Sequence, residues 1–262
     1  MLIDTHCHIA GDEFVDDLAQ VVSRAQDAGV DQAICILDAT ARVELDRVAT
    51  VRAAWPSVRF VAGVHPHHAG AVALDELGRV VSSALEASSA IAVGEIGLDY
   101  HYDFAPRTVQ REVFGRQVAM AVQRGLPVVI HTREADADTL EVLDAAGTGR
   151  ARGVFHCFTG DQALADAAVA RGFHVSFSGI VTFPRAEALR AVAATIPPDR
   201  WLVETDSPYL SPAPGRGGRN EPARVVRVLE TMASVRGLPV AEAAAQALAN
   251  AAAVFGDVGP NR

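Results

Sequence analysis

The stretch RGLPVVIHTREA, residues 124–135, contains the unit that decides the fold. A segment of helical period, Arg107 to Arg124, ends there, and Gly125 follows at the point where a helix would stop. A short apolar run then extends from Pro127 to His131 and predicts a buried strand. The stretch therefore predicts a helix, then a strand, then a polar side chain at the end of that strand.

The same unit recurs along the chain. Seven further apolar runs are Leu2 to Thr5, Asp31 to Leu37, Val58 to Val64, Ala90 to Glu95, Gly153 to Phe158, Phe173 to Ser178 and Trp201 to Asp206. Other segments of helical character are Asp16 to Ala28, Asp161 to Ala170, Glu221 to Arg236 and an Ala-rich final helix, Val240 to Phe255. Gly29, Gly172 and Gly237 follow three of them. Eight strand–helix units within 262 residues predict an α/β fold, a single-domain (β/α)8 TIM barrel over residues 1–262.

Net charge, apolar segments and cysteine content limit the functions that this chain can have. The net charge is −9, and all 23 basic residues are arginines because the chain has no lysine. An acidic chain is a poor general binder of nucleic acid, so any phosphate must be held locally, by metal or by a few arginines. No apolar stretch approaches the roughly 20 residues of a membrane span, and no basic leader precedes an apolar segment. We therefore expect a cytoplasmic protein with no membrane partner and no evident obligate protein partner. Three cysteines without framework spacing argue against disulfides.

Residues that bind metals or carry protons follow the apolar runs one after another. They are His6 and His8 after the first run, Glu95 in the fourth, His131 in the fifth, His156 in the sixth and Asp206 in the eighth. Because the carboxyl ends of parallel strands converge at one mouth of a barrel, these side chains are predicted to share one pocket. This regularity favours a metal site over scattered surface histidines.

The number of these residues suggests the kind of site. Four histidines and two carboxylates exceed the ligand set of one tetrahedral ion, whereas two divalent ions about 3.5 to 4 Å apart would use all six if one carboxylate bridges them. Glu95 is central in strand order and is the natural bridge. A carbamylated lysine is excluded because the chain has no lysine. The histidines suit Zn, Mn, Ni or Co, but exchangeable sites take what the cell supplies, so Mg, Mn and Zn remain open.

Seven short motifs together resemble the TatD family of metal-dependent deoxyribonucleases, within the amidohydrolase-like barrels. They are DTHCH (4–8), GVHPH (63–67), GEIGLDY (94–100), PVVIHTREA (127–135), GVFHCFTG (153–160), VETDSPYLSP (203–212) and RGGRNEP (216–222). The resemblance implies a (β/α)8 fold, a binuclear metal centre and phosphodiester hydrolysis by 3' to 5' exonuclease action. It implies one metal held by His6, His8, Glu95 and Asp206, and a second held by Glu95, His131 and His156.

Two groups of residues near the expected mouth need other roles. His65 would exceed the ligand count, so we assign it to the scissile phosphate, with a packed loop histidine before Pro66 as the alternative. Arg133, Arg216 and Arg219 follow strand ends, and planar guanidinium groups suit phosphate oxygens. A plain surface role is the alternative for each arginine.

Two carboxylates are expected one layer below the metals. Asp4 shares the alternation face of His6 and His8, and Glu204 shares that of Asp206. Carboxylates in that layer can orient ligating imidazoles through their second ring nitrogen. A buried polar network without catalytic weight is the alternative. His67 is expected to be solvated, and His174, early in its run, to be structural.

Three functional hypotheses follow. The leading one is hydrolysis of DNA phosphodiesters by water activated between two divalent ions, with Glu95 bridging the ions and Asp206 also able to accept the proton. The second is hydrolysis of an ester, in D-aminoacyl-tRNA or a small lactone, at the same centre, and the acidic net charge slightly favours it over processive action on long DNA. The third is a metal-binding protein without turnover. The expected partner is nucleic acid as substrate, DNA or tRNA.

Overall fold

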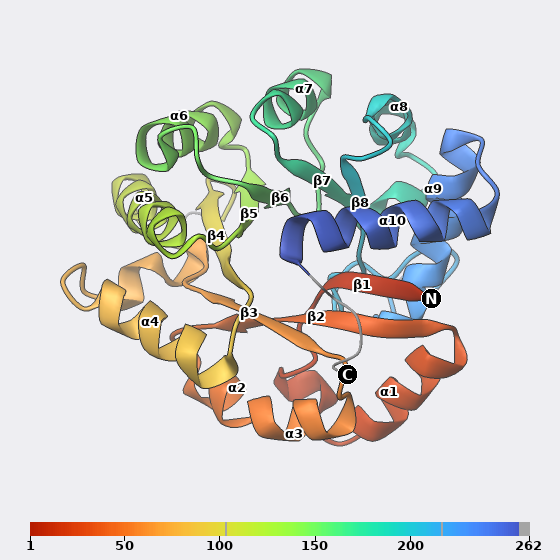
Figure 1. The fold of residues 1–262 in the computed structure, drawn as a ribbon, viewed down its shortest axis with the longest axis horizontal. Helices are drawn as coiled ribbons and strands as arrows, with labels where there is room; N and C mark the ends of the chain where they lie inside the picture. The colour runs from red at the N-terminus through yellow and green to blue at the C-terminus, as the bar shows by residue number, and fades with distance from the viewer. Residues whose placement is uncertain (103, 216, 257–262) are drawn as a thin grey trace.

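A parallel eight-stranded sheet, in the order β1 to β8, forms the centre of the molecule in a computed structural model (Figure 1). The structure describes residues 1–102, 104–215 and 217–256. The strands are β1 (Leu2–Cys7), β2 (Val30–Asp38), β3 (Arg59–Gly63), β4 (Ala92–Asp99), β5 (Val128–Arg133), β6 (Gly153–Phe155), β7 (His174–Phe177) and β8 (Trp201–Val203). Each strand pairs in parallel with the next, as the alternating apolar runs predicted.

The barrel closes between the carboxyl ends of its first and last strands. His8 N donates to Ser207 O at 2.8 Å, and Asp206 N donates to His6 O at 2.9 Å. Cys7 and Ser207 form the parallel bridge between these two hydrogen bonds. Closure therefore fixes the backbones of His6, His8 and Asp206 relative to one another.

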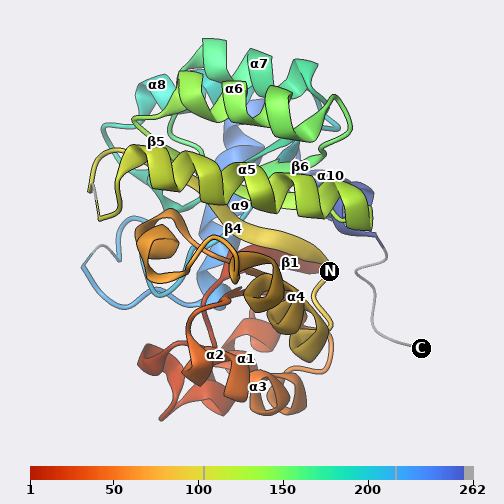
Figure 2. The same cartoon turned by 90° about the vertical axis from the view of Figure 1, so that its left-hand side faces the viewer.

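Helices surround the sheet and confirm the predicted (β/α)8 barrel (Figures 1 and 2). They are α1 (Leu18–Asp27), α2 (Arg42–Asp46), α3 (Val48–Ala54), α4 (Leu77–Ser88), α5 (Arg107–Arg124), α6 (Asp136–Gly147), α7 (Gln162–Ala170), α8 (Glu187–Thr195), α9 (Val225–Arg236) and α10 (Val240–Phe255). Short 3-10 helices occur at Asp12–Phe14, Pro66–Ala71, Gly179–Thr182 and Pro222–Arg224.

Element bounds agree best with the sequence where stop signals are strong. Helices α5 and α10 have the predicted bounds. Four glycines that follow helices have the positive φ that glycine adopts without steric cost: Gly29, Gly125, Gly172 and Gly237. Strand β4 instead extends four residues beyond Glu95, to Asp99, because its continuation pairs with β5. The three cysteines are free, as expected.

Helix α10 covers the end of the barrel opposite the mouth. Its Ala251, Val254 and Phe255 join an apolar cluster with residues from the strands. The strand members of this cluster are Ile3, Ile34, Ile36, Val61, Ala92, Val129, Val154 and Leu202. Figure 1 shows α10 lying across the strands. The barrel is thus sealed below, and its polar residues are left at the other end.

The helices in the described part of the chain are too short or too polar to span a membrane singly. Among the described residues no single helix meets the requirement, and the pair Pro222–Arg236 and Val240–Phe255 meets it only jointly, on length and composition, with a bend of 106°.

A buried histidine links stability to pH. His174 begins β7 and is 5% exposed, and burial together with the charge of Arg200 lowers its pKa from 6.5 to about 4. The folded state disfavours protonation of this ring. Its contribution to the free energy of unfolding is therefore fully present above pH 6.5 and is lost as the pH falls toward about 4. The loss is about 3 kcal/mol at most.

We expect His174→Leu to remove this acid-side slope. Urea unfolding of the wild type and the variant at several pH values between 4 and 8 measures it: the wild type should lose stability relative to the variant as the pH falls below 6.5. Parallel stability curves would contradict the assignment.

Candidate metal centre

Polar side chains within or just after four strands converge on Glu95 at the mouth of the barrel. Glu95 lies within β4 and is 6% exposed. The others are His6 in β1, His8 directly after β1, His131 in β5, His156 directly after β6, and Asp206 after β8. The structure brings all six of the predicted ligands together. Three overlapping groups of them, one of which adds His65, have donor atoms within 4.8 Å of one another.

One oxygen of Glu95, Oε2, faces the first donor group. His6 Nε2 lies 3.2 Å from His8 Nε2, 3.4 Å from Glu95 Oε2 and 3.6 Å from Asp206 Oδ1. His8 Nε2 lies 3.4 Å from Asp206 Oδ1 and 3.9 Å from Glu95 Oε2. Four ligands about 2.1 Å from a tetrahedral ion are themselves about 3.4 Å apart. These donors therefore fit one divalent cation almost as they stand.

The other oxygen, Oε1, faces the second group. It lies 2.6 Å from His156 Nε2, 2.9 Å from His131 Nδ1 and 3.3 Å from His65 Nε2. His156 Nε2 and His131 Nδ1 are 3.5 Å apart. The two shorter contacts are hydrogen-bond lengths, so a cation here would require a small outward movement of the rings. The donor types fit such an ion, and Glu95 is placed to bridge the two groups.

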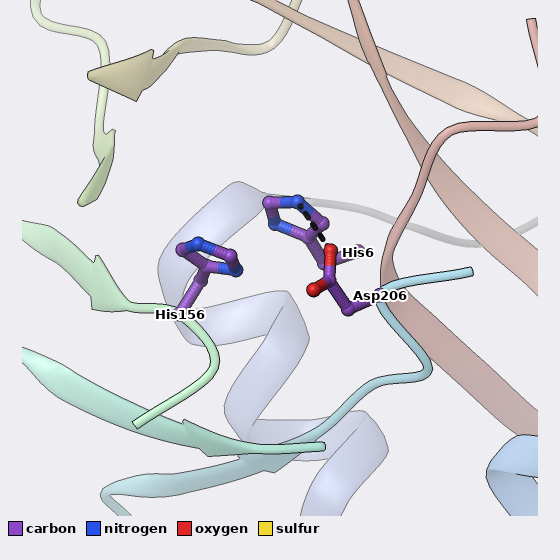
Figure 3. Close-up of side chains that lie close together, drawn as sticks. All are labelled: His6, His156 and Asp206. Atoms are coloured by element: carbon purple, nitrogen blue, oxygen red, sulfur yellow. Dashed lines mark ion pairs between the residues drawn. The ribbon is translucent and has the colours of Figure 1, made fainter. Parts of the chain in front are cut away.

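Figure 3 shows how His6, His156 and Asp206 meet. The rings of His6 and His156 are stacked, with centroids 4.0 Å apart and planes inclined by 14°. Asp206 has a φ of 56°, a left-handed conformation that aspartate tolerates better than most residues. This turn, held by the hydrogen bond to His6 O, directs the carboxylate toward the two histidines of β1.

Protonation in this cluster depends on burial and on the mixture of charges. Burial alone would raise the pKa of Glu95, but His156, His65 and His131 together hold it well below its ordinary value. Burial, reinforced by the charge of His156, lowers the pKa of His6. Its Nδ1 is buried and has no hydrogen-bond partner among the described residues. A carboxylate beside a neutral imidazole is the state that binds metal.

The two carboxylates expected below the metals behave differently. Glu204 Oε1 lies 3.2 Å from His156 Nδ1 and accepts from Cys157 N at 2.6 Å, so it contacts the ring as expected. Asp4 accepts from the backbone N of His6 and from the N and Oγ1 of Thr205. The Asp4 carboxylate is thus held by the backbone of His6 and by the backbone and hydroxyl of Thr205, and among the described residues no hydrogen bond joins it to an imidazole ring.

Asp99 was missed in the analysis of the sequence. Its carboxylate is buried, and Oδ2 lies 3.1 Å from His131 Nε2 and 2.8 Å from His67 Nε2. His67, expected to be solvated, is instead tied to it. The signal was present in GEIGLDY, since Asp99 is on the same strand face as Glu95 at an even spacing.

His65, which the sequence assigned to the phosphate, lies within the second donor group, beside Glu95 and His131. Its Nε2 approaches Glu95, and its Nδ1 accepts from His67 N at 3.1 Å. A neutral ring that accepts at Nδ1 carries its proton on Nε2. His65 is therefore suited to donating a hydrogen bond to an anionic oxygen.

The three arginines assigned to phosphate have different surroundings. The Arg133 guanidinium lies over the Tyr102 ring, 4.8 Å from its centroid. Arg219 donates to Asp17 at 2.8 and 2.6 Å and lies over Phe14, so its guanidinium is held by the segment that follows β1. Arg216 lies outside the described residues.

The barrel and its two donor groups around Glu95 are typical of a metal-dependent hydrolase of the (β/α)8 class. A family model described as TatD related DNase matches residues 3–256, and the chain belongs to this family. Membership removes the interpretation of a metal-binding protein without turnover.

Individual relatives of this chain also belong to metal-dependent hydrolases or to TatD proteins by their names. The metal-dependent hydrolase YcfH of Escherichia coli K12 is 38% identical over 258 residues, covering 97% of this chain and 95% of the relative. The 3'-5' ssDNA/RNA exonuclease TatD of Erwinia amylovora is 33% identical, covering 97% of this chain and 100% of that protein. The crystal structure of YJJV, a TatD homolog from Escherichia coli K12, superposes with a TM-score of 0.88 at 30% identity, covering 97% of both chains.

Replacement of Glu204 tests whether it positions His156. We expect Glu204→Gln to weaken binding of Mn²⁺ by the metal-free protein about 10- to 100-fold, because glutamine keeps the acceptor for Cys157 N but removes the charge beside His156. Titration calorimetry measures the affinity. Glu134→Gln, at an exposed glutamate paired with His101, is the matched control and should bind as the wild type does. Equal affinities in all three proteins would exclude a positioning role.

Proposed function

We propose that this chain hydrolyses phosphodiester bonds of single-stranded DNA from the 3' end, with RNA as a related substrate. The observation that carries the proposal is Glu95, whose two oxygens face two separate groups of metal donors. Such an arrangement is typical of two-metal hydrolases. The activity printed for the Erwinia amylovora relative supports the choice of substrate.

We assign His6, His8, Glu95 and Asp206 to one divalent ion, and Glu95, His131 and His156 to a second. Mg, Mn and Zn are the candidate ions. We further propose that residues 1–262 act as one domain and that the protein works in the cytoplasm.

The residues of the site then divide the work. Two divalent ions held by these residues would supply an acidified water and neutralise charge that develops on the phosphate. Asp206 presents Oδ1 to His6 and His8, so its other carboxylate oxygen can take the proton of the attacking water. His65, protonated on Nε2, donates to a phosphate oxygen. Glu204 holds the His156 ring and Asp99 holds the His131 ring during the reaction.

Ester hydrolysis at the same centre, as in deacylation of D-aminoacyl-tRNA, is the second candidate. The net charge of −9 and the pairing of Arg219 with Asp17 favour it, since both reduce the grip on a long phosphate backbone.

One side-by-side assay separates the two. Protein reconstituted with Mn²⁺ or Mg²⁺ receives 5'-labelled single-stranded DNA, RNA and D-aminoacyl-tRNA, while metal analysis counts the ions per chain. We expect about two ions and stepwise shortening of the DNA from its 3' end, abolished by EDTA. Deacylation without shortening of either polymer would select the ester hydrolase, and saturation at one ion would remove the binuclear centre.

A further inference from the structure

Exposed aromatic side chains gather at the mouth of the barrel. Only three aromatic residues, Tyr102, Phe104 and Tyr209, are among the exposed large hydrophobic side chains of the described residues. All three lie on loops that follow strands, Tyr102 and Phe104 after β4 and Tyr209 after β8. Figure 2 shows the loop between β4 and α5 on the side away from α10 and the N-terminus. An exposed aromatic ring at a catalytic mouth is a candidate for contact with substrate.

Tyr102 and Phe104 form one parallel pair. Their ring centroids are 5.5 Å apart, their planes differ by 4°, and the two side chains are 49% and 67% exposed. The ring of His67 stands nearly perpendicular to both, 5.4 Å from Tyr102 and 4.8 Å from Phe104. The His67 ring therefore supports the pair on its inner side, while both aromatic rings remain exposed to solvent.

The same carboxylate that holds a ligand ring also holds this pair. Asp99 Oδ2 contacts His131 Nε2 and His67 Nε2, and Asp99 Oδ1 accepts from Tyr102 N at 3.0 Å. One buried side chain thus fixes the distance between the aromatic pair and the metal donors.

A second buried side chain braces the loop from inside. Gln110, on α5, donates from Nε2 to Asp99 O at 3.0 Å and to Ala105 O at 2.8 Å, and its Oε1 accepts from Asp99 N at 2.8 Å. The segment that carries the two rings is held at both ends. Holding the backbone on either side of exposed rings reduces the entropy that they lose on binding.

We propose that Tyr102 and Phe104 form a stacking platform for a nucleobase of the substrate strand, beside the metal centre. The proposal rests on the proposed nuclease function and specifies how that site grips a single strand. Every base has a π-face, so stacking holds a strand without regard to sequence, and it does not depend on a strongly basic surface, which suits a chain of net charge −9. Arg133, over the Tyr102 ring, adds one cation at the platform.

Three variants test the platform. Tyr102→Ala with Phe104→Ala removes both rings, and Tyr102→Phe with Phe104→Tyr keeps them. Val240→Ala is the matched control, because Val240 is an exposed apolar residue that begins α10 at the closed end of the barrel. Each protein, loaded with Mn²⁺, receives one single-stranded oligonucleotide with all its bases and another whose last few 3' residues are abasic.

We expect the double alanine variant to raise KM for the base-bearing strand about tenfold with little change in kcat. The abasic strand should show a raised KM that is the same in every variant. The aromatic-for-aromatic variant and Val240→Ala should behave as the wild type does. A spectroscopic signature accompanies this: 2-aminopurine at the 3' end should be quenched by metal-free protein that carries both rings and not by the double alanine variant.

Other outcomes overturn the proposal in distinct ways. An unchanged KM in the double alanine variant would reject the platform. If the oligomeric mass of that variant also changed, the rings would be assigned to contact between copies of the chain. An equal rise of KM on both strands would mean that the loop acts through the geometry of the metal site. Failure of the wild type to cleave either strand would reject the nuclease itself, and the platform with it.

Discussion

Glu95→Gln is expected to abolish hydrolysis, lowering kcat/KM by at least about a thousandfold, or about 4 kcal/mol in transition-state stabilisation. Glutamine has nearly the same volume but only one oxygen that can bind a cation, whereas both oxygens of Glu95 face donor groups. Loss of the bridge should also reduce the ions bound per chain from about two to at most one. Metal analysis and steady-state kinetics on the single-stranded oligonucleotide measure the two effects.

Controls separate this effect from unfolding. Circular dichroism should show the wild-type spectrum, because the apolar core lies below the site and against the outer helices. Glu134→Gln, an exposed change of the same kind, should keep both activity and ion content. Normal turnover with two ions bound to Glu95→Gln would show that this carboxylate does not bridge an essential pair.

Gly97→Ala is expected to destabilise the fold by about 4 kcal/mol or more, in the exceptional range for one substitution. Gly97 has a φ of +146°, which side-chain-bearing residues rarely adopt, and an added Cβ would lie 1.9 Å from the carbonyl oxygen of His131. The clash is with the backbone of the paired strand, so no side-chain rotation relieves it. Since we propose His131 as a metal ligand, metal content should fall as well.

Gly115→Ala is the matched control for this change. Gly115 lies within α5, and a Cβ there meets Val142 Cγ1 at 3.6 Å, an ordinary contact. Alanine is the better helix former, by roughly 1 kcal/mol, so this variant should be as stable as the wild type or more so. Thermal unfolding and soluble yield compare the three proteins. A Gly97→Ala protein with the wild-type Tm and ion content would refute the argument.

The sequence by itself determined the barrel fold and which six donor residues gather at its mouth. Apolar runs such as Pro127 to His131 encode which residues are buried, and stop signals such as Gly125 and Gly237 mark where helices end. These are local properties, because strand alternation and helix period depend on neighbours along the chain. The convergence of His6, Glu95, His131 and the other strand-end donors then followed from one rule of parallel barrels.

Only the tertiary structure decided which side chains touch. Arg219 pairs with Asp17 across 202 positions, and Asp99 meets His131 only because β4 and β5 pair with Asp99 opposite Arg133. Such partners depend on the register between strands, which is set by pairing with distant segments. The positions of the two Glu95 oxygens and the contacts of Asp4 with Thr205 therefore depended on tertiary contacts, which local periodicity does not encode.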